Sequence, residues 1–220
     1  MFGNNPIRKP EKTDGSKLQI QQIFATFQGE GIYTGWPAIF IRLGGCNLAC
    51  SFCDTEFESF EETPLNNVLE NVSKLDNKRK IPLIVITGGE PLRQNINPLC
   101  EELIKTGYKI QIETNGTLYQ SLPEDVDIVC SPKNNKGYHR IREDLLERIN
   151  AFKFIISADI KEYSNIADVG QYDYNIPVYV QPMDEQNEDK NQANIRRTIE
   201  IASENSCRIS LQTHKILGVE

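Results

Sequence analysis

The sequence predicts an α/β fold, an incomplete or open (β/α) barrel with parallel strands. Strand-like and helix-like runs alternate with short connections from Leu18 onward. The run Leu83–Thr87 is apolar at most positions, a pattern typical of a strand buried on both faces of a parallel sheet. A closed barrel of eight units usually needs about 250 residues. The chain has 220 residues, so we expect the barrel to remain unclosed.

Eight strands are expected where β-branched and aromatic residues concentrate between turn signals. They are Leu18–Phe24, Ala38–Leu43, Leu83–Thr87, Tyr108–Glu113, Val126–Ser131, Phe152–Ser157, Ile176–Gln181 and Arg208–Gln212.

Four helices are expected between these strands. The first has Thr63 as N-cap, Pro64 at the first helical position and an apolar face that continues to Leu75. The others are Asn97 to Gly107, Arg142–Ile149 and Gln192–Ser203.

Composition and charge narrow the class of protein. The net charge is −7, which argues against a broad nucleic-acid interface. No run approaches the roughly 18 apolar residues of a membrane helix. Residues 1–17 mix basic and acidic residues without an apolar run, unlike a secretory or transit signal. We therefore expect a cytoplasmic protein with a flexible tail over residues 1–17, a single domain over 18–220, and no membrane or nucleic-acid partner.

Glycine and polar residues follow five of the expected strands. Because carboxyl ends of parallel strands meet at one edge of a sheet, we expect these segments to form one shared site. The five segments are Gly44-Gly45-Cys46, Thr87-Gly88-Gly89-Glu90, Glu113-Thr114-Asn115-Gly116, Ser131-Pro132-Lys133 and Gln181-Pro182-Met183-Asp184.

Three of the six cysteines fall within eight residues, in the pattern Cys46-x₃-Cys50-x₂-Cys53. Three thiolates from one loop can hold three corners of a [4Fe–4S] cluster and leave the fourth iron open to a ligand. A zinc knuckle with a distant fourth ligand, or three unrelated core cysteines, remain alternatives. The other cysteines lie in apolar patterns and are expected to be small buried side chains: Cys100, Cys130 and Cys207.

The cysteine spacing, with Phe52 before the last cysteine, resembles the signature of radical S-adenosylmethionine (SAM) enzymes. Gly88-Gly89-Glu90-Pro91 resembles the glycine-rich motif with which that superfamily contacts SAM. Gly-Gly-Glu-Pro alone would read as an ordinary turn. The two motifs in this order make the resemblance specific, and it implies a radical SAM barrel.

Further motifs resemble the 7-carboxy-7-deazaguanine synthase family, from Gln21 to the end of the chain. They are Phe27-Gln28-Gly29-Glu30-Gly31, Trp36-Pro37-Ala38, Arg42-Leu43-Gly44-Gly45-Cys46-Asn47-Leu48, Cys53-Asp54-Thr55, Ser131-Pro132-Lys133, Gln181-Pro182-Met183-Asp184 and Gln212-Thr213-His214-Lys215.

This resemblance implies a ring contraction that belongs to queuosine (7-deazapurine) biosynthesis. The substrate would be 6-carboxy-5,6,7,8-tetrahydropterin, and the products 7-carboxy-7-deazaguanine and ammonia. A reduced [4Fe–4S] cluster would cleave SAM to a 5′-deoxyadenosyl radical, which takes a hydrogen from the substrate and later returns it. The resemblance also implies Mg²⁺, an external electron donor of the flavodoxin or ferredoxin type, and a homodimer.

The resemblance assigns site residues as well, none of them a general acid or base. It places Mg²⁺ on Thr55. Glu113 is left open as a further SAM contact, and residues 138–162 show no pattern that we can assign. The implied SAM contacts are Phe52, Cys53, Asp54, Gly89, Ser131, Pro132, Lys133, Gln181, Pro182, Met183 and Asp184. The implied substrate contacts are Phe27, Gln28, Gly29, Arg42, Thr87, His214 and, through its terminal carboxylate, Glu220.

Other roles and functions remain open at this stage. Arg42 could form a structural ion pair, His214 could be a core histidine, and Gln28 could be a solvated loop residue. A radical SAM activase that makes a glycyl radical in a partner enzyme is the alternative within the superfamily. An iron–sulfur electron carrier and a zinc-dependent binding module are alternatives from other classes, but they leave the Gly88–Pro91 motif unexplained.

Overall fold

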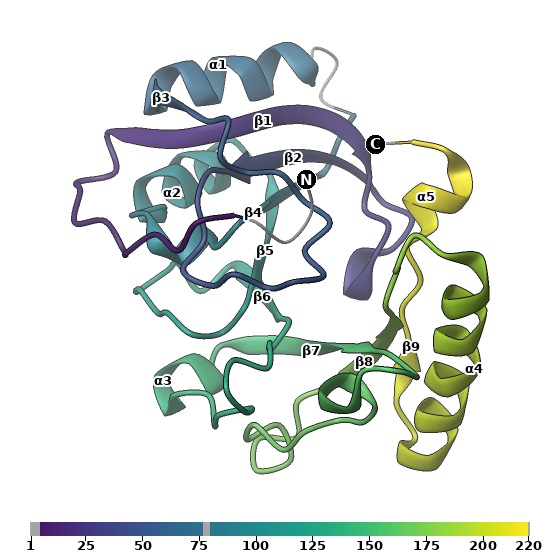
Figure 1. Ribbon diagram of the computed structural model, residues 1–220. Coiled ribbons are helices and arrows are strands. Elements are labelled where there is room, and N and C mark those ends of the chain that lie inside the picture. Colours follow the sequence, from purple (N-terminus) through teal and green to yellow (C-terminus); the bar gives the residue numbers. More distant parts are fainter. Residues whose placement is uncertain (1–4, 77–79, 220) are drawn as a thin grey trace.

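The computed structural model describes residues 5–76 and 80–219, and the strands in these ranges form one nine-stranded sheet (Figure 1). The order across the sheet is β3-β1-β2-β4-β5-β6-β7-β8-β9. The bounds are β1 Lys17–Phe27, β2 Pro37–Leu43, β3 Glu61–Pro64, β4 Leu83–Gly88, β5 Lys109–Thr114, β6 Val126–Cys130, β7 Ile149–Ile156, β8 Val178–Pro182 and β9 Arg208–Ile209.

The sheet is parallel from β2 to β9, with in-register pairs such as Ile39 with Ile84 and Ile86 with Ile112. At one edge, β1 runs antiparallel to both β2 and β3. Figure 1 shows the sheet curling from β3 to β9, and these two strands remain its separate edges. The prediction of an incomplete parallel barrel is therefore confirmed.

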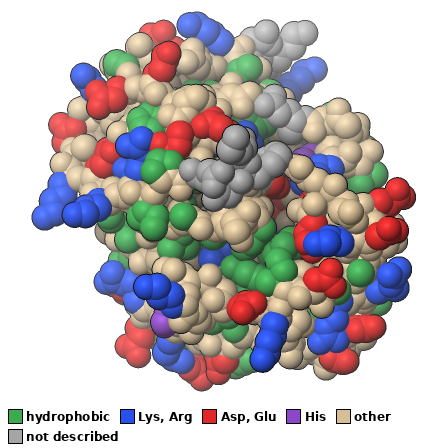
Figure 2. All heavy atoms as spheres, in the orientation of Figure 1, with side chains coloured by type: hydrophobic (Ala, Val, Ile, Leu, Met, Phe, Trp, Pro, Cys, Tyr) green, Lys and Arg blue, Asp and Glu red, His purple; other side chains and the backbone are tan. Residues whose placement is uncertain are grey.

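Helices cover the outer face of the sheet, where α1 (Leu65–Leu75) packs on β1, α2 (Asn97–Lys105) on β5 and α4 (Glu188–Asn205) on β8. Two helices are shorter: α3 (Glu143–Leu146) buries Leu145 and Leu146 in the main core, whereas α5 (Thr213–Leu217) has no buried residue. Figure 2 shows charged side chains of both signs around the rim of the viewed face and apolar side chains nearer its centre. Within residues 5–76 and 80–219, the helices lack the length and apolar content needed to cross a bilayer.

Alternate residues of each strand point to opposite faces of the sheet, which separates the core from the site. On β2, Ile39, Ile41 and Leu43 are fully buried in the main core, which also contains residues of α1, α2 and α4. Burying one such side chain contributes about 1.5–3 kcal/mol. Because this outer core stabilises the domain, the inner face is free to carry Arg42 and other polar groups.

Two helices begin at different residues from those predicted. Thr63 pairs with Leu18 as part of β3, so Pro64 becomes the N-cap position and α1 begins at Leu65. The predicted helix Gln192–Ser203 begins earlier, because the Asn187 side chain accepts a hydrogen bond from the backbone N–H of Lys190 at 3.1 Å.

Two further elements are shorter than predicted, and one helix was not predicted. The helix expected over Arg142–Ile149 is limited to α3, because Ile149 already begins β7. The strand expected over Arg208–Gln212 ends at Ile209, and the chain then turns toward the site. The following helix α5 was not predicted.

One loop lies on the inner side of the sheet, and we call residues 28–36 the 28–36 segment. It is closed by backbone hydrogen bonds from Gln28 N to Trp36 O at 2.8 Å and from Gly35 N to Gln28 O at 2.7 Å. From this loop the Tyr33 hydroxyl donates to Asp127 on β6. The 28–36 segment thus connects the first strands of the sheet with the later ones.

The N-terminal residues that the structure describes follow the cysteine loop. Ile7 forms a β-bridge with Cys46, and Arg8 donates from its backbone N–H to Cys46 O at 2.7 Å. Glu11 pairs with the buried guanidinium of Arg93 at 2.9 Å. The expected flexibility of residues 1–17 concerns motion and stays a prediction, and residues 1–4 lie outside the described part.

Arg93 connects this N-terminal segment to the core. Its side chain is 1% exposed, and it also donates to the backbone oxygen of Gly44 at 3.0 Å. Because Arg93→Met removes the buried cation that pairs with Glu11, we expect it to lower the free energy of unfolding by about 3 kcal/mol in urea denaturation. The matched control is Arg142→Met, whose ion pair with Asp144 is exposed and should be worth less than about 1 kcal/mol. Equal losses in the two variants would refute this role.

Candidate active site

Two adjoining cavities lie at the carboxyl ends of the parallel strands. The first contains the cysteine motif. The second lies beside β1 and β2. Residues from all five predicted strand-end segments line the first cavity, so the expected shared site is confirmed. The residues that line both cavities are Glu30, Asp54, Thr55, Thr87, Gly88, Glu113 and Gln212.

The three motif cysteines lie in the loop that follows β2. Cys46 is buried, whereas Cys50 and Cys53 are half-buried, and all three line the first cavity. The loop is held by hydrogen bonds from Cys53 N to Cys50 O at 3.2 Å and from Leu48 N to the Cys46 sulfur at 3.4 Å. Leu48 and Phe57 pack with the cysteines in a small apolar cluster.

The glycine-rich segment after β4 lies directly against the cysteine loop. A Cβ atom on Gly89 would lie 2.2 Å from Gly45 O and 2.8 Å from Cys46 Cβ, so only glycine permits this approach. The backbone N–H of Glu90 donates to Gly45 O at 3.0 Å. The two sequence motifs therefore form one unit in space.

Glu90 of the same motif is fully buried and fixes two strand ends. Its carboxylate accepts from Leu92 N at 3.0 Å, Asn115 N at 2.7 Å and the Thr114 hydroxyl at 2.7 Å. Burial raises the pKa of Glu90, against the effect of these three donors. Glu90 thereby holds the end of β5 beside the cysteine loop.

The three motif thiols line one cavity and suit an iron–sulfur cluster. Burial raises the pKa of all three, to about 11 for Cys46, so their thiolates require a positively charged partner such as iron. In a cluster, each thiolate would hold a different iron and the fourth iron would stay open to a ligand.

Most of the predicted SAM contacts line the first cavity with the cysteines. Half-buried Lys133 donates to the backbone oxygen of Ser131 at 2.6 Å and to its hydroxyl at 2.7 Å, and desolvation lowers the pKa of Lys133. Pro132 between them is not part of the lining. The predicted contacts in the lining are Phe52, Cys53, Asp54, Gly89, Ser131, Lys133, Gln181, Pro182, Met183 and Asp184.

A three-membered ion cluster crosses the mouth of the site. Lys215 of α5 lies 2.6 Å from Asp184, which follows β8, and 3.4 Å from Asp54 of the cysteine loop. The hydrogen bond from Lys215 lowers the pKa of Asp184 to about 2. This cluster ties α5 to both the sheet and the cysteine loop.

Four predicted substrate contacts line the second cavity together with Gln28: Phe27, Arg42, Thr87 and His214. The Arg42 guanidinium lies 5.1 Å from the centre of the Phe24 ring. Burial lowers the pKa of His214, and the charge of Glu30 opposes this effect.

Gln28 and Gly29 shape the second cavity in different ways. The Gln28 side chain is 1% exposed, donates to Glu113 at 2.9 Å and accepts from the backbone N–H of Glu30 at 3.0 Å. Gln28 is thus buried, in contrast to the solvated alternative. Gly29 packs against His214, where a Cβ atom would lie 2.0 Å from the imidazole Nδ1.

Thr55 lies at the border of the two cavities, and its hydroxyl donates to the Asp54 carboxylate at 3.1 Å. Its backbone oxygen accepts from Asn5 at 3.1 Å. Glu220, the last predicted substrate contact, lies outside the described residues.

Several residues at the site were not predicted from the sequence. Glu30 and Lys153 line the first cavity and form a buried ion pair. In the segment without an assigned pattern, Tyr138 packs 6.1 Å from Tyr163, and the Tyr163 ring lies 4.9 Å from Phe52, edge to face. Lys153 could have been noticed in the sequence, because it is a lysine within the apolar run of β7. The packing of the aromatic residues corresponds to no local sequence pattern.

Comparisons with known proteins agree with this site. The profile of the Radical SAM superfamily matches residues 40–132. A 7-carboxy-7-deazaguanine synthase of Rickettsia prowazekii (strain Madrid E) is 56% identical over 225 residues, covering 100% of this chain and 96% of that protein. A protein of the same name from Rhodospirillum rubrum is 47% identical over 160 residues, covering 72% and 66%. The crystal structure of QueE from Escherichia coli superposes with a TM-score of 0.69 at 28% identity, covering 89% and 93%.

The open parallel sheet, the cysteine loop and the adjacent glycine motif define a radical SAM enzyme. The identity over the whole length narrows the class further. The chain belongs to the 7-carboxy-7-deazaguanine synthase family, as the sequence motifs predicted.

The ion cluster on Lys215 gives a pH prediction. The pKa of Asp184 is lowered from 3.8 to about 2 in the folded state, so its contribution to stability is present above pH 3.8 and is lost as the pH falls through about 2. Lys215→Met should lower the free energy of unfolding at pH 7 by about 1 kcal/mol or less, because the pair is partly solvated. This difference should shrink between pH 4 and pH 2, measured by denaturant titration.

The control for this prediction is Lys74→Met, because Lys74 is exposed and its pairing with Glu70 is loose, at 3.9 Å. A deficit in Lys215→Met that stays constant down to pH 2 would show that Asp184 is not the partner that matters.

Proposed function

We propose that the protein converts 6-carboxy-5,6,7,8-tetrahydropterin to 7-carboxy-7-deazaguanine and ammonia, with catalytic use of SAM. The observation that carries this proposal is the pair of adjoining cavities. The predicted cluster and SAM contacts line one, and the predicted substrate contacts line the other. The family to which the chain belongs supplies the reaction. The alternative of a glycyl-radical activase gains no support, because the relatives carry the name of the synthase.

Cys46, Cys50 and Cys53 would hold a [4Fe–4S] cluster, which with SAM supplies the electron and the radical chemistry. Gly89 lets the backbone approach closely enough for SAM to lie against the cluster loop. Lys133 and Asp184 provide a cation and an anion in the same cavity, which suit the carboxylate and ammonium groups of methionine. Met183 and Ile155 supply apolar surface to the same cavity.

The second cavity would hold the pterin. Arg42 can pair with the substrate carboxylate through its guanidinium, and His214 can donate a further hydrogen bond. Gln28 already uses one N–H and one lone pair within the protein, so its remaining N–H and lone pair are available to the pterin edge. Thr55 and Thr87 lie where the two cavities meet, which places the substrate beside SAM.

The proposed enzyme binds Mg²⁺, receives electrons from an external donor and forms a homodimer. Thr55 offers a hard oxygen ligand at the border of the cavities, and Mg²⁺ commonly combines few protein ligands with substrate oxygens. Half-buried Cys50 beside exposed Ser51 supports electron entry from a flavodoxin- or ferredoxin-type donor. The exposed apolar residues Ile216 and Leu217 support a homodimer. Six free thiols suit the reducing cytoplasm.

The function is tested by anaerobic reconstitution with iron and sulfide, followed by incubation with SAM, dithionite and the carboxytetrahydropterin. Mass analysis should show the deazaguanine product with much less than one equivalent of free 5′-deoxyadenosine. One nucleoside per product over many turnovers would show that SAM is consumed, and the absence of product would refute the function.

Replacing any of Cys46, Cys50 or Cys53 by Ala should abolish both the cluster absorbance and turnover, because each supplies one iron ligand. The wild type should contain about four irons per chain. Cys100→Ala is the matched control, since this buried cysteine lies outside both cavities and should affect mainly stability. Stoichiometric zinc without iron would contradict the prediction.

Thr55→Ala should reduce the stimulation of turnover by Mg²⁺, because it removes the proposed protein ligand. The measurement is the initial rate against Mg²⁺ concentration in chelator-treated enzyme. Thr117→Ala removes an exposed hydroxyl outside the cavities and should leave the Mg²⁺ response unchanged. Equal wild-type rates with Mg²⁺ and with chelator would remove the metal from the proposal.

A further inference from the structure

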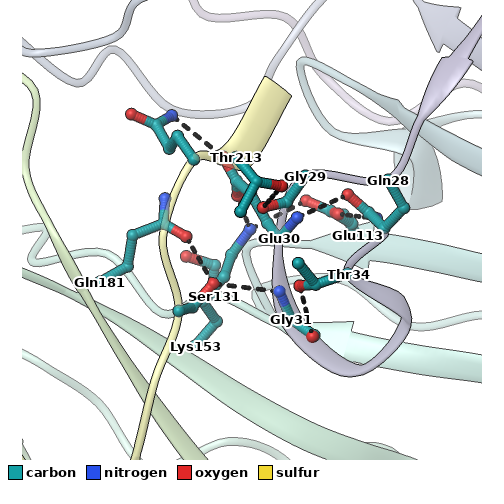
Figure 3. Close-up of polar contacts among 12 residues, drawn as sticks. Gln28, Gly29, Glu30, Gly31, Thr34, Glu113, Ser131, Lys153, Gln181 and Thr213 are labelled. Atoms are coloured by element: carbon teal, nitrogen blue, oxygen red, sulfur yellow. Dashed lines mark hydrogen bonds and ion pairs between the residues drawn. The ribbon is translucent and has the colours of Figure 1, made fainter. Parts of the chain in front are cut away.

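A buried lysine occupies the wall of the first cavity, where the second cavity begins (Figure 3). Lys153 lies in the middle of β7, and its side chain is only 5% exposed. Its ammonium contacts Glu30 Oε2 and lies 3.1 Å from Glu113 Oε2. One cation is thus shared by two carboxylates, both of which line both cavities.

The second oxygen of each carboxylate is also occupied. Glu30 Oε1 accepts from the Gln212 side chain at 2.9 Å. Glu113 Oε1 accepts from Gln28 at 2.9 Å and from Gln111 at 3.0 Å. Every carboxylate oxygen of the pair therefore has a donor, and Lys153 is the only one of these donors that carries a charge.

The group connects four parts of the chain that are distant in sequence. Lys153 belongs to β7, Glu113 to β5 and Glu30 to the 28–36 segment, while Gln212 immediately precedes α5. Glu30 is two residues from Gln28, whose side-chain amide donates to Glu113. Gly29, between them, packs against His214. The position of Glu30 thus governs how residues of the second cavity are presented.

Burial makes the charge of Lys153 necessary. The two carboxylates lie around one point with little water, so removing the cation would leave two like charges facing each other. The pKa of Lys153 is raised by Glu113 and Glu30 against the effect of burial, and that of Glu30 is lowered to about 2. Lys153 and Glu30 are consequently both charged at neutral pH.

We propose that Lys153 is a positioning residue, which fixes the 28–36 segment through Glu30 and so holds the wall between the two cavities. This role rests on the proposed function for its catalytic meaning. Without Lys153 the two carboxylates repel, the 28–36 segment detaches from β7, and Gln28 and His214 lose their orientation. The pterin is then bound more weakly, while the cysteine loop is unaffected. SAM cleavage therefore becomes uncoupled from product formation.

Four variants distinguish the effect of the Lys153 charge from that of its side-chain length, and the contact with Glu30 from the contact with Glu113. Lys153→Met keeps the side-chain length and removes the charge, and Lys153→Arg keeps the charge. Glu30→Gln cuts the connection to the 28–36 segment, whereas Glu113→Gln leaves that connection in place. Lys190→Met is the control, because Lys190 pairs with Glu185 at 2.9 Å, away from the 28–36 segment, and lines neither cavity.

The first measurement is amide hydrogen exchange of the reconstituted full-length enzyme without substrate. Exchange in residues 28–36 should rise by roughly tenfold or more in Lys153→Met and Glu30→Gln, and little in Glu113→Gln and Lys190→Met. Unchanged exchange in both of the first two variants would overturn the proposal. If Lys153→Met does not fold, Glu30→Gln and Glu113→Gln decide alone, because the role requires the former to loosen the segment more than the latter.

The second measurement is the kinetic signature. In Lys153→Met the KM for the pterin should rise by roughly tenfold, with a smaller fall in kcat and a smaller change in SAM affinity. The ratio of free 5′-deoxyadenosine to product should rise as well, and Lys153→Arg should restore part of each value. A fall in kcat alone, with KM and the ratio unchanged, would overturn the positioning role. If the wild type makes no product, the proposed function fails, while the exchange measurement still tests the connection through Lys153.

Discussion

The inner, concave face of an unclosed parallel sheet must be covered by other parts of the chain. The rest of this structure depends on which segment covers it. In a closed barrel, layers of side chains meet at the centre. Here the sheet ends at β3 on one side and at the two-residue strand β9 on the other. The 28–36 segment lies in the opening and makes contacts with β5, β6 and β7 through Gln28, Tyr33 and Glu30. The cavities exist because this segment fills one part of the opening and leaves the strand ends accessible.

The outer face of the sheet contributes most of the stability, whereas the inner face carries the polar residues of the site. The outer face is an apolar core in which Ile41 and Ile84 are fully buried against the helices. The inner face carries amides, carboxylates and lysines, whose burial is costly unless each has a partner. A charge pair 4 Å apart interacts by about 4 kcal/mol at the effective dielectric near a protein surface. Such pairs can therefore fix the inner groups in place, although the outer core provides most of the stability.

The sequence predicted what depends on local pattern. The parallel sheet followed from the apolar run of β4, and the shared site followed from strand ends such as Glu113 and Ser131. The strand β3 could not be predicted, because Glu61–Pro64 is polar and is fixed only by pairing with β1. Lys153 was missed for a related reason. A single lysine in an apolar strand has no partner in the sequence, and Glu30 and Glu113 become its partners only in the folded chain.

The segments that cover the site are held by ion pairs of unequal burial, and this difference predicts how the cover behaves. The pair between Glu30 and Lys153 is almost dry, with side chains 14% and 5% exposed. The pair between Lys215 and Asp184 is 39% and 26% exposed. Salt screens solvated pairs far more than buried ones, so rising ionic strength weakens the attachment of α5 before that of the 28–36 segment. The substrate cavity therefore has one fixed wall, built on Lys153, and one wall at α5 that opens more readily.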